Sequence, residues 1–126
     1  MKSKFSISWK SSKQRRKQRK YRYNAPLHIK HKFLSSHLSK DLIKKYKKRS
    51  LPIRKGDKVK ILRGQFRGKE GKVEKIITKK TKVYISGIES IRIDGTKRYY
   101  PIHASNLMIM ELNLEDKRRK EVLERK

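Results

Sequence analysis

The chain has 126 residues, of which 39 are Lys or Arg and 11 are Asp or Glu, so its formal net charge at pH 7 is +28. A charge of this size repels itself unless a polyanion neutralises it, and nucleic acid is the first candidate. The sequence has no cysteine, which excludes disulfides and thiolate metal sites, and no apolar run near the roughly 18 residues of a membrane-spanning helix.

Length and composition predict one domain with extensions. With 33% apolar residues only a modest core can form, which disfavours a large enzyme cleft. No signal-peptide segment follows Met1, so we expect a soluble cytoplasmic protein without a membrane partner. We expect four segments: a basic arm at 1–23, a helical segment at 24–50, a small β-barrel at 51–112 and a carboxy-terminal helix at 113–126.

The arm carries much of the excess charge, since residues 1–50 hold 18 Lys or Arg and one acid. Between Lys10 and Tyr23 only the two tyrosines could pack a core, so we expect the free arm to be disordered and to order on RNA. Tyr21 and Tyr23 could stack on bases or on Arg22, or pack on the barrel. The arm residues predicted to bind RNA are Lys10, Lys13, Arg15, Arg16, Lys17, Arg19, Lys20 and Arg22.

The first expected helix begins near Asn24 and Pro26, because Asn caps helices well and Pro is tolerated in the first turn. Leu27, His31 and Leu34 would form a thin apolar line along it. Two histidines three residues apart could share one metal, but no cysteine or acid cluster supplies further ligands, so we expect no metal site. Beside lysines they are predicted to face phosphate, and the residues concerned are His28, Lys30, His31 and Lys32.

The second helix is better supported by the sequence. Ser39 can cap it, Asp41 suits its positive end, and Pro52 lies beyond its end. Its apolar stripe consists of Leu42, Ile43 and Tyr46, and the basic residues at its negative end are Lys47, Lys48 and Arg49.

A strand, a glycine-rich turn and a second strand are expected between Lys55 and Ile76. The apolar residues of the first strand alternate with lysines, and this period of two is typical of a half-buried strand. Gly64, Gly68 and Gly71 lie where the chain would need positive φ or a close backbone approach, which glycine permits without strain.

Basic residues between these glycines indicate a binding loop. The simpler interpretation is that the glycines only shape a turn, but a structural turn usually carries Asn, Ser or Asp in place of Arg63, Arg67 and Lys69. We therefore expect this loop to contact RNA phosphates. The residues predicted to bind RNA around the barrel are Arg54, Lys55, Arg63, Gly64, Arg67, Gly68, Lys69 and Lys72.

Short strands are expected near 57–62, 71–77, 81–86 and 107–112, with a hairpin between Ile91 and Tyr100 that turns on Asp94-Gly95 as a two-residue loop. Five such strands in about sixty residues favour a mainly β fold, an SH3-like barrel. The last helix is expected to begin at a capping Asn113, with Glu115 and Asp116 in its first turn.

No catalytic motif is visible. The acids are scattered, and the sequence from Arg63 to Gly71 is not a phosphate-cradling P-loop because Gly71-Lys72 is followed by Val73. We expect neither an enzyme nor a cofactor.

The glycine-rich segment resembles the KOW motif, with Gly56-Asp57 before the first strand and Gly71-Lys72-Val73 opening the second. Joined to the upstream pieces Asn-Ala-Pro at 24–26 and Leu-Ser-Lys-Asp-Leu at 38–42, it is similar to the archaeal and eukaryotic branch of the universal large-subunit ribosomal protein family twenty-four, called twenty-six in eukaryotes. Eukaryotic relatives carry a longer basic carboxy-terminal extension, so the resemblance favours an archaeal source.

That resemblance implies a structural constituent of the large ribosomal subunit that binds large-subunit rRNA early in assembly, near the peptide exit tunnel. Its partners would be this rRNA and neighbouring large-subunit proteins, with one copy of the chain in each ribosome. The alternatives are a KOW-type transcription elongation factor, which would normally add a second domain, and a chromatin protein, which would insert apolar wedges into DNA. An RNA-acting enzyme would need a metal-binding acid cluster that the sequence does not display.

Overall fold

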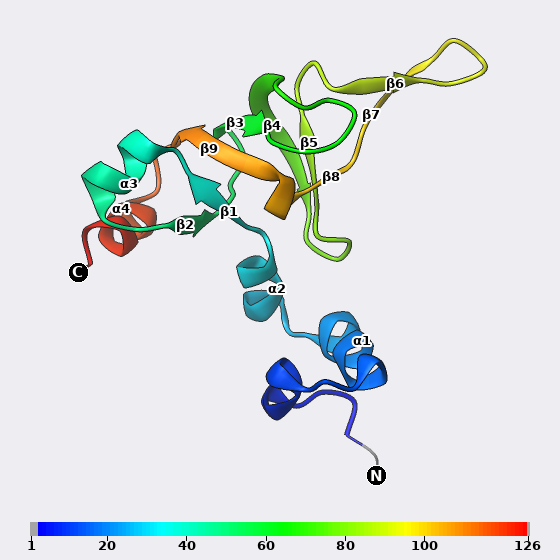
Figure 1. Cartoon of the computed structure of the whole chain (residues 1–126), viewed down its shortest axis with the longest axis vertical. Coiled ribbons are helices and arrows are strands. Elements are labelled where there is room, and N and C mark those ends of the chain that lie inside the picture. Colours follow the sequence, from blue (N-terminus) through cyan, green and yellow to red (C-terminus); the bar gives the residue numbers. More distant parts are fainter. Residues whose placement is uncertain (1–2, 126) are drawn as a thin grey trace.

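A computed structural model gives the architecture of residues 3–125. Met1, Lys2 and Lys126, which the sequence analysis assigns to the arm and the last helix, lie outside the described residues. A mainly β body has the helical arm at one end and a projecting hairpin at the other (Figure 1).

Within residues 3–125 the elements follow one another in this order: η1 (Ile7–Ser11), α1 (Arg15–Asn24), α2 (Leu27–Phe33), β1 (Ser35–Leu38), α3 (Lys40–Tyr46), β2 (Ser50–Pro52), β3 (Lys58–Ile61), β4 (Glu70–Ile77), β5 (Lys82–Ile85), β6 (Glu89–Ile91), β7 (Lys97–Tyr99), β8 (Ile102–His103), η2 (Ala104–Asn106), β9 (Leu107–Glu111) and α4 (Lys117–Glu124).

In the described part of the chain, seven strands form one curved sheet in the order β2-β1-β9-β3-β4-β5-β8. Neighbouring strands are antiparallel except β1 and β9, which run parallel with Leu38 opposite Ile109. The edge strands β2 and β8 do not pair with each other among these residues, so the sheet stays open. The expected small, mainly β fold with short helices is confirmed, but the sheet is not a closed barrel among these residues, and β1, β2 and β8 are not predicted from the sequence.

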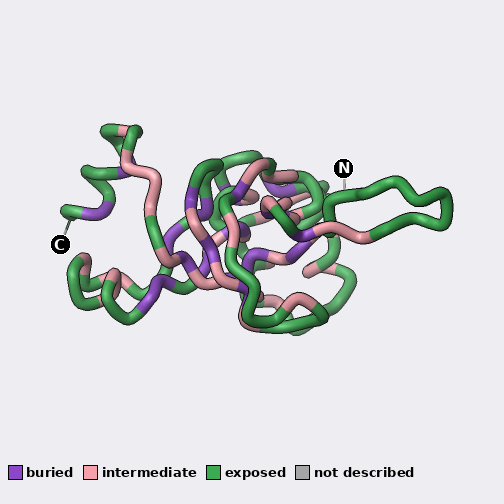
Figure 2. The backbone as a smooth tube through the Cα atoms, turned by 90° about the horizontal axis from the view of Figure 1, so that it is seen from above, coloured by how far each residue is buried: buried purple, intermediate pink, exposed green. Residues whose placement is uncertain are grey.

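Strands β3 and β4 show why the alternating pattern predicts this sheet. Val59 and Ile61 are fully buried, while Lys58 and Lys60 point to the other face and lie 3.0 Å from Glu111 and Glu70. Buried backbone gathers in the sheet and exposed backbone in the projecting hairpin (Figure 2). The residues of the main core are Leu34, Leu38, Leu51, Ile53, Val59, Ile61, Val73, Val83, Ile85, Ile88, Ile102, Ala104, Leu107, Ile109 and Leu123.

The arm forms a helix of its own, α1, which its basic sequence does not predict. Tyr21 is buried there, because its ring stacks on Phe5 at 5.3 Å between centroids and meets the edge of Phe33 at 5.9 Å. Tyr21 therefore packs in a small cluster formed by the arm and α2 rather than on the sheet, whereas Tyr23 is 76% exposed. The apolar partner Phe5 lies before the basic run, outside the stretch in which only the tyrosines could pack. Disorder of the arm in the free protein stays a prediction.

The expected capping role of Asn24 is wrong, although a helix does begin next to Pro26. Asn24 is the last residue of α1, and its side-chain Nδ2 donates a hydrogen bond to the Lys4 carbonyl instead of capping the next helix. Helix α2 begins at Leu27 with Pro26 in the capping position. The error arises because an Asn-x-Pro sequence suits the end of one helix as well as the beginning of another.

The second predicted helix is confirmed as α3. The Ser39 hydroxyl accepts a hydrogen bond from the Leu42 N–H at 3.4 Å, and Asp41 lies in the first turn. The helix ends where Lys47 takes the left-handed conformation with φ of 54°, well before Pro52.

The projecting hairpin of β6 and β7 has a longer loop than the sequence predicts. Ile91 pairs with Lys97 rather than with Tyr100, and the Arg92 N–H donates to the Thr96 carbonyl. The two-residue loop is therefore wrong. The Asp94 carboxylate instead accepts hydrogen bonds from both the N–H and the hydroxyl of Thr96. These bonds hold residues 94–96 in a local turn just before β7.

The last helix also begins later than expected. Its cap is Asp116, whose Oδ1 accepts from the Arg118 N–H at 2.9 Å, so Asn113 is not the cap and Glu115 lies outside the helix. Asn113 instead accepts a hydrogen bond from the Glu115 N–H at 3.0 Å and forms a local turn.

Asp57, which follows Gly56 at the entry to β3, forms a buried ion pair. The Asp57 carboxylate is fully buried and receives both terminal nitrogens of Arg119, each at 2.6 Å. It also accepts the N–H groups of Arg54 and Asn113 at 2.9 Å, so α4 and the entry to β3 share one anion. Gly56 has φ of +89°, and a Cβ there would meet Asn113 Nδ2 at 2.8 Å.

Gly71 permits close contact between β4 and the end of β5. A Cβ at this position would lie 2.6 Å from the Ser86 carbonyl oxygen and 2.7 Å from Ile85 Cγ2. We expect Gly71→Ala to lower the free energy of unfolding by about 1–3 kcal/mol, because overpacking a rigid site costs that much. Urea unfolding followed by circular dichroism measures the change. A variant as stable as the wild type would show that the strands can separate without cost.

Candidate nucleic-acid interface

The turn between β3 and β4 presents the first group of predicted RNA-binding residues. Gly64 and Gly68 have φ of +97° and +88°, so the predicted need for glycine is confirmed at both. The Gly68 N–H donates to the Ile61 carbonyl at 2.8 Å and the Arg67 N–H to the Gly64 carbonyl at 3.1 Å. These bonds hold the turn closed and leave its cations exposed.

An aromatic contact fixes this turn against the base of the hairpin. The Phe66 ring lies 5.1 Å from the Tyr100 ring, and the Lys69 ammonium lies 5.4 Å from the Phe66 centroid. The loop is therefore preorganised, which reduces the conformational entropy lost when its cations bind a partner.

Helix α1 presents the second group. Gln18 ties the preceding turn to this helix, because its Nε2 donates to the carbonyls of Trp9, Lys10 and Ser12 at 2.9–3.0 Å. The predicted arm residues that the helix and turn leave exposed are Lys10, Lys13, Arg15, Arg16, Arg19 and Arg22, and those that are half-buried are Lys17 and Lys20.

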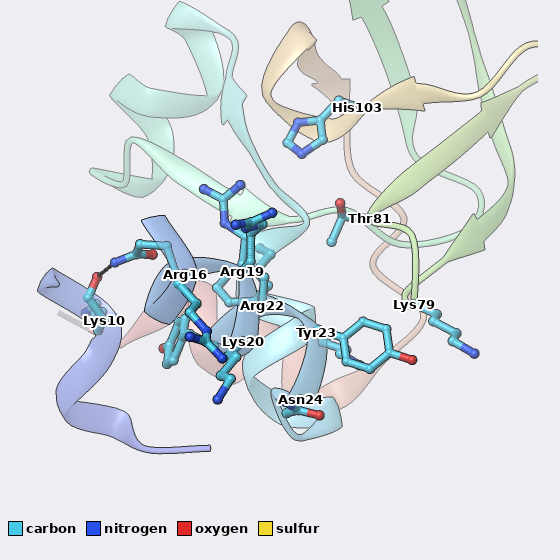
Figure 3. Close-up of a pocket in the computed structure, with 14 residues that line it drawn as sticks. Lys10, Arg16, Arg19, Lys20, Arg22, Tyr23, Asn24, Lys79, Thr81 and His103 are labelled. Carbon is cyan, nitrogen blue, oxygen red and sulfur yellow. Dashed lines mark hydrogen bonds between the residues drawn. The ribbon is translucent and has the colours of Figure 1, made fainter. Parts of the chain in front are cut away.

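A groove of about 950 Å³ lies between this arm and the turn that joins β4 to β5 (Figure 3). Six residues predicted to bind RNA line it, and no Asp or Glu occurs in its described lining. The lining residues are Lys10, Arg16, Gln18, Arg19, Lys20, Tyr21, Arg22, Tyr23, Asn24, Lys30, Phe33, Lys79, Thr81 and His103.

Three groove residues come from the β body and are not among the residues predicted to bind RNA: Lys79, Thr81 and His103. They come from segments more than fifty residues beyond the arm, and no local motif marks them. Thr81 carries one signal that only coordinates reveal, since this β-branched residue has φ of +51°, in the left-handed region.

Partial burial and two nearby cations favour the neutral form of His103. Partial burial lowers the pKa of the His103 imidazole below its usual 6.5, and the charges of Lys82 and Arg22 lower it further. Its Nδ1 accepts the Ser105 N–H at 3.2 Å, a bond that requires an unprotonated Nδ1. The neutral ring therefore carries its proton on Nε2.

We expect this environment to make stability depend on pH. Because the pKa of His103 is lower in the folded state than in the unfolded state, its contribution is complete above about pH 6.5 and is lost as the pH falls through the folded pKa. Between pH 7.5 and 5.5 the wild type should therefore lose more free energy of unfolding than His103→Gln, which cannot titrate. Urea unfolding at each pH measures both. Identical pH profiles would contradict this assignment.

The remaining predicted residues are dispersed over other surfaces. Arg54 forms an ion pair with Asp116, so part of its charge is already neutralised. His31, Arg54 and Lys55 line a second cavity of about 560 Å³ together with Glu115 and Asp116, whose negative charge disfavours an anionic ligand there. The other predicted residues outside the arm, the groove and the β3–β4 turn are the exposed His28, Lys32 and Lys72.

Residues 3–125 contain no group of three His, Cys, Asp or Glu side chains arranged to hold a metal ion. Over the same residues, none of the helices has both the length and the apolar character needed to cross a membrane.

Two comparisons with known proteins agree. A family model described as ribosomal proteins L26 of eukaryotes and L24 of archaea matches residues 12–126. The chain is also 53% identical over 115 residues to the large ribosomal subunit protein uL24 of Methanosphaera stadtmanae, covering 91% of this chain and 98% of that protein.

Proposed function

This chain belongs to the family of ribosomal proteins L26 of eukaryotes and L24 of archaea, and from that membership we propose how its cationic surfaces bind rRNA. It is a structural constituent of the large ribosomal subunit rather than an enzyme, and it resides in the ribosome with rRNA and other ribosomal proteins. Neither comparison supports the alternative of a transcription factor or a chromatin protein.

The observation that carries the proposal is the placement of two cationic surfaces at opposite ends of β4. The β3–β4 turn, with Arg63, Arg67 and Lys69, precedes this strand, and the β4–β5 turn, which borders the arm groove, follows it. A straight strand of this length would separate the two by roughly 26 Å. We propose that they contact two different segments of large-subunit rRNA.

Contacts of this kind are made mostly to phosphates and 2′-hydroxyls. Lys and Arg side chains at both surfaces neutralise phosphates and release counterions, so binding weakens steeply with salt. A-form RNA hides its base edges in a deep groove, which favours recognition of shape over sequence. One copy of the chain would act in each ribosome, with neighbouring large-subunit proteins as its other partners.

The test of this proposal is sedimentation of a native lysate through a sucrose gradient at high salt, with the protein and rRNA quantified in each fraction. We expect the protein in a one-to-one ratio with large-subunit rRNA. Its appearance with polymerase, with chromosomal DNA or in the top fractions would refute integral membership of the subunit.

The β3–β4 turn is tested separately by Arg63→Ala together with Arg67→Ala. Both side chains are exposed, so stability should not change, whereas affinity for large-subunit rRNA should fall by about tenfold or more because two phosphate contacts are lost. Filter binding with the purified rRNA measures this affinity. Unchanged affinity and unchanged subunit assembly would refute the role of this turn.

A further inference from the structure

The arm groove has a shape and chemistry that suit an unpaired nucleotide. Its volume of about 950 Å³ lies within the range of sites that enclose small molecules, and a base-paired RNA helix is too wide to enter such a space. A single strand, or one nucleotide displaced from a stack, has a phosphate, a ribose and a flat base that fit it.

Tyr23 offers a flat surface for that base. Its side chain is 76% exposed although it lines the groove, while the neighbouring Tyr21 is buried against Phe5 and Phe33. The ring of Tyr23 lies beside Lys79 at one side of the opening (Figure 3). Stacking on tyrosine accepts any base, since every base has a π face.

Cations from both walls can hold the phosphates that flank such a base. Arg16, Arg19 and Arg22 come from α1, and Lys79 comes from the turn between β4 and β5. In Figure 3 the side chains of Arg19 and Arg22 extend toward Thr81 and His103. The two walls of the groove therefore come from parts of the chain that are far apart in the sequence.

The far wall supplies a neutral hydrogen-bond donor and a strained residue. Because Nδ1 of His103 accepts from Ser105, its Nε2–H is free to donate to a base edge or a 2′-hydroxyl. Thr81 keeps φ of +51°, a conformation that is costly for a β-branched side chain and that is typical of functional sites.

We propose that this groove binds one unpaired RNA nucleotide, with its base stacked on Tyr23, its flanking phosphates held by α1 and Lys79, and His103 donating from Nε2. This inference rests on the proposed rRNA-binding function and adds the structural class of RNA that the arm recognises. The β3–β4 turn contributes no residue to this groove.

The test compares full-length variants on two probes at about 150 mM salt: an unstructured oligo(U) 12-mer and a 12-base-pair RNA duplex. Tyr23→Ala should weaken binding of the single strand by about fivefold or more, because stacking on an aromatic ring contributes that much per base, and leave the duplex within about twofold. Tyr23→Phe keeps the ring and should bind both probes like the wild type.

Matched controls separate the groove from general charge and exposed apolar surface. Lys79→Ala should weaken single-strand binding more than Lys80→Ala, which removes the same charge from the adjacent residue outside the groove lining. Leu27→Ala removes another large exposed side chain, at the start of α2 and outside the groove lining, and should change neither affinity. Equal effects of the two lysine variants, or an equal loss on both probes for Tyr23→Ala, would overturn the inference.

Ultraviolet crosslinking of purified large subunits gives an independent result. A crosslink from Tyr23 to a nucleotide that chemical probing shows as unpaired supports the proposal, and a crosslink to a base-paired nucleotide overturns it. If the wild-type protein does not sediment with the subunit, the ribosomal role itself fails. If it sediments normally and only the Tyr23 results fail, the groove assignment alone is wrong.

Discussion

Asp57→Ala should lower the free energy of unfolding by about 3–5 kcal/mol, the usual cost of leaving a buried charge without its partner. The alanine would remove the only described carboxylate that contacts Arg119, whose side chain is 4% exposed. It would also leave the backbone N–H groups of Arg54 and Asn113 without their acceptor, since both donate to Asp57. Since small domains are stable by about 5–15 kcal/mol, a large part of the chain's stability depends on this carboxylate.

Urea unfolding of the purified protein at pH 7, followed by circular dichroism, measures this change. The matched control is Glu111→Ala, which breaks an ion pair of similar chemistry in an exposed position, 3.0 Å from Lys58. Exposed pairs contribute little, so this variant should unfold like the wild type. If both variants lose the same free energy of unfolding, burial does not explain the contribution of the Asp57–Arg119 pair to stability, and the prediction is wrong.

Replacing Arg15, Arg16, Arg19 and Arg22 by Gln should lower affinity for large-subunit rRNA by about a hundredfold or more. Each lost phosphate contact should also reduce the slope of log affinity against log salt by roughly 0.7–0.9, so the slope falls by about three units in all. Glutamine is a good helix former, so α1 should persist and the loss should reflect charge rather than folding. Filter binding at several salt concentrations gives both quantities.

The control changes the same net charge on another helix. Replacing Lys40, Lys44, Lys45 and Lys47 by Gln removes four exposed cations from α3 and the residue that ends it, away from both proposed surfaces. We expect a much smaller loss of affinity and a nearly unchanged salt slope. Equal slopes for the two variants would mean that the protein binds RNA through its net charge alone.

The local sequence pattern was sufficient to predict strand β3 and the glycine-rich turn that follows it. Val59 and Ile61 alternate with lysines because one face of β3 is buried, and this burial is visible in the sequence as a period of two. Gly64 and Gly68 could be predicted for a similar reason, since their positive φ values are a local requirement of the turn. The exposure of the cations in the arm and in the β3–β4 turn could also be predicted, because charged side chains stay in contact with solvent unless they are paired.

Features that depend on distant partners could not be predicted. The pairing of β1 with β9 joins Leu38 to Ile109, and four residues between two helices give no periodic signal of their own. His103 and Lys79 enter the groove only because the fold places them opposite the arm. The two wrong caps share another cause, because Asn24 and Asn113 use their side chains for other hydrogen bonds that compete with capping.

The parallel pairing of β1 with β9 also determines when this protein can finish folding during its synthesis. The strand at residues 35–38 leaves the ribosome long before its neighbour at 107–111. At roughly 5–20 residues per second, the interval between them is on the order of 4–14 seconds. Until β9 emerges, the only described strand that can pair with β1 is β2, while the arm that precedes β1 is already outside. A nascent chain would therefore present its cationic arm to RNA before its own sheet is complete.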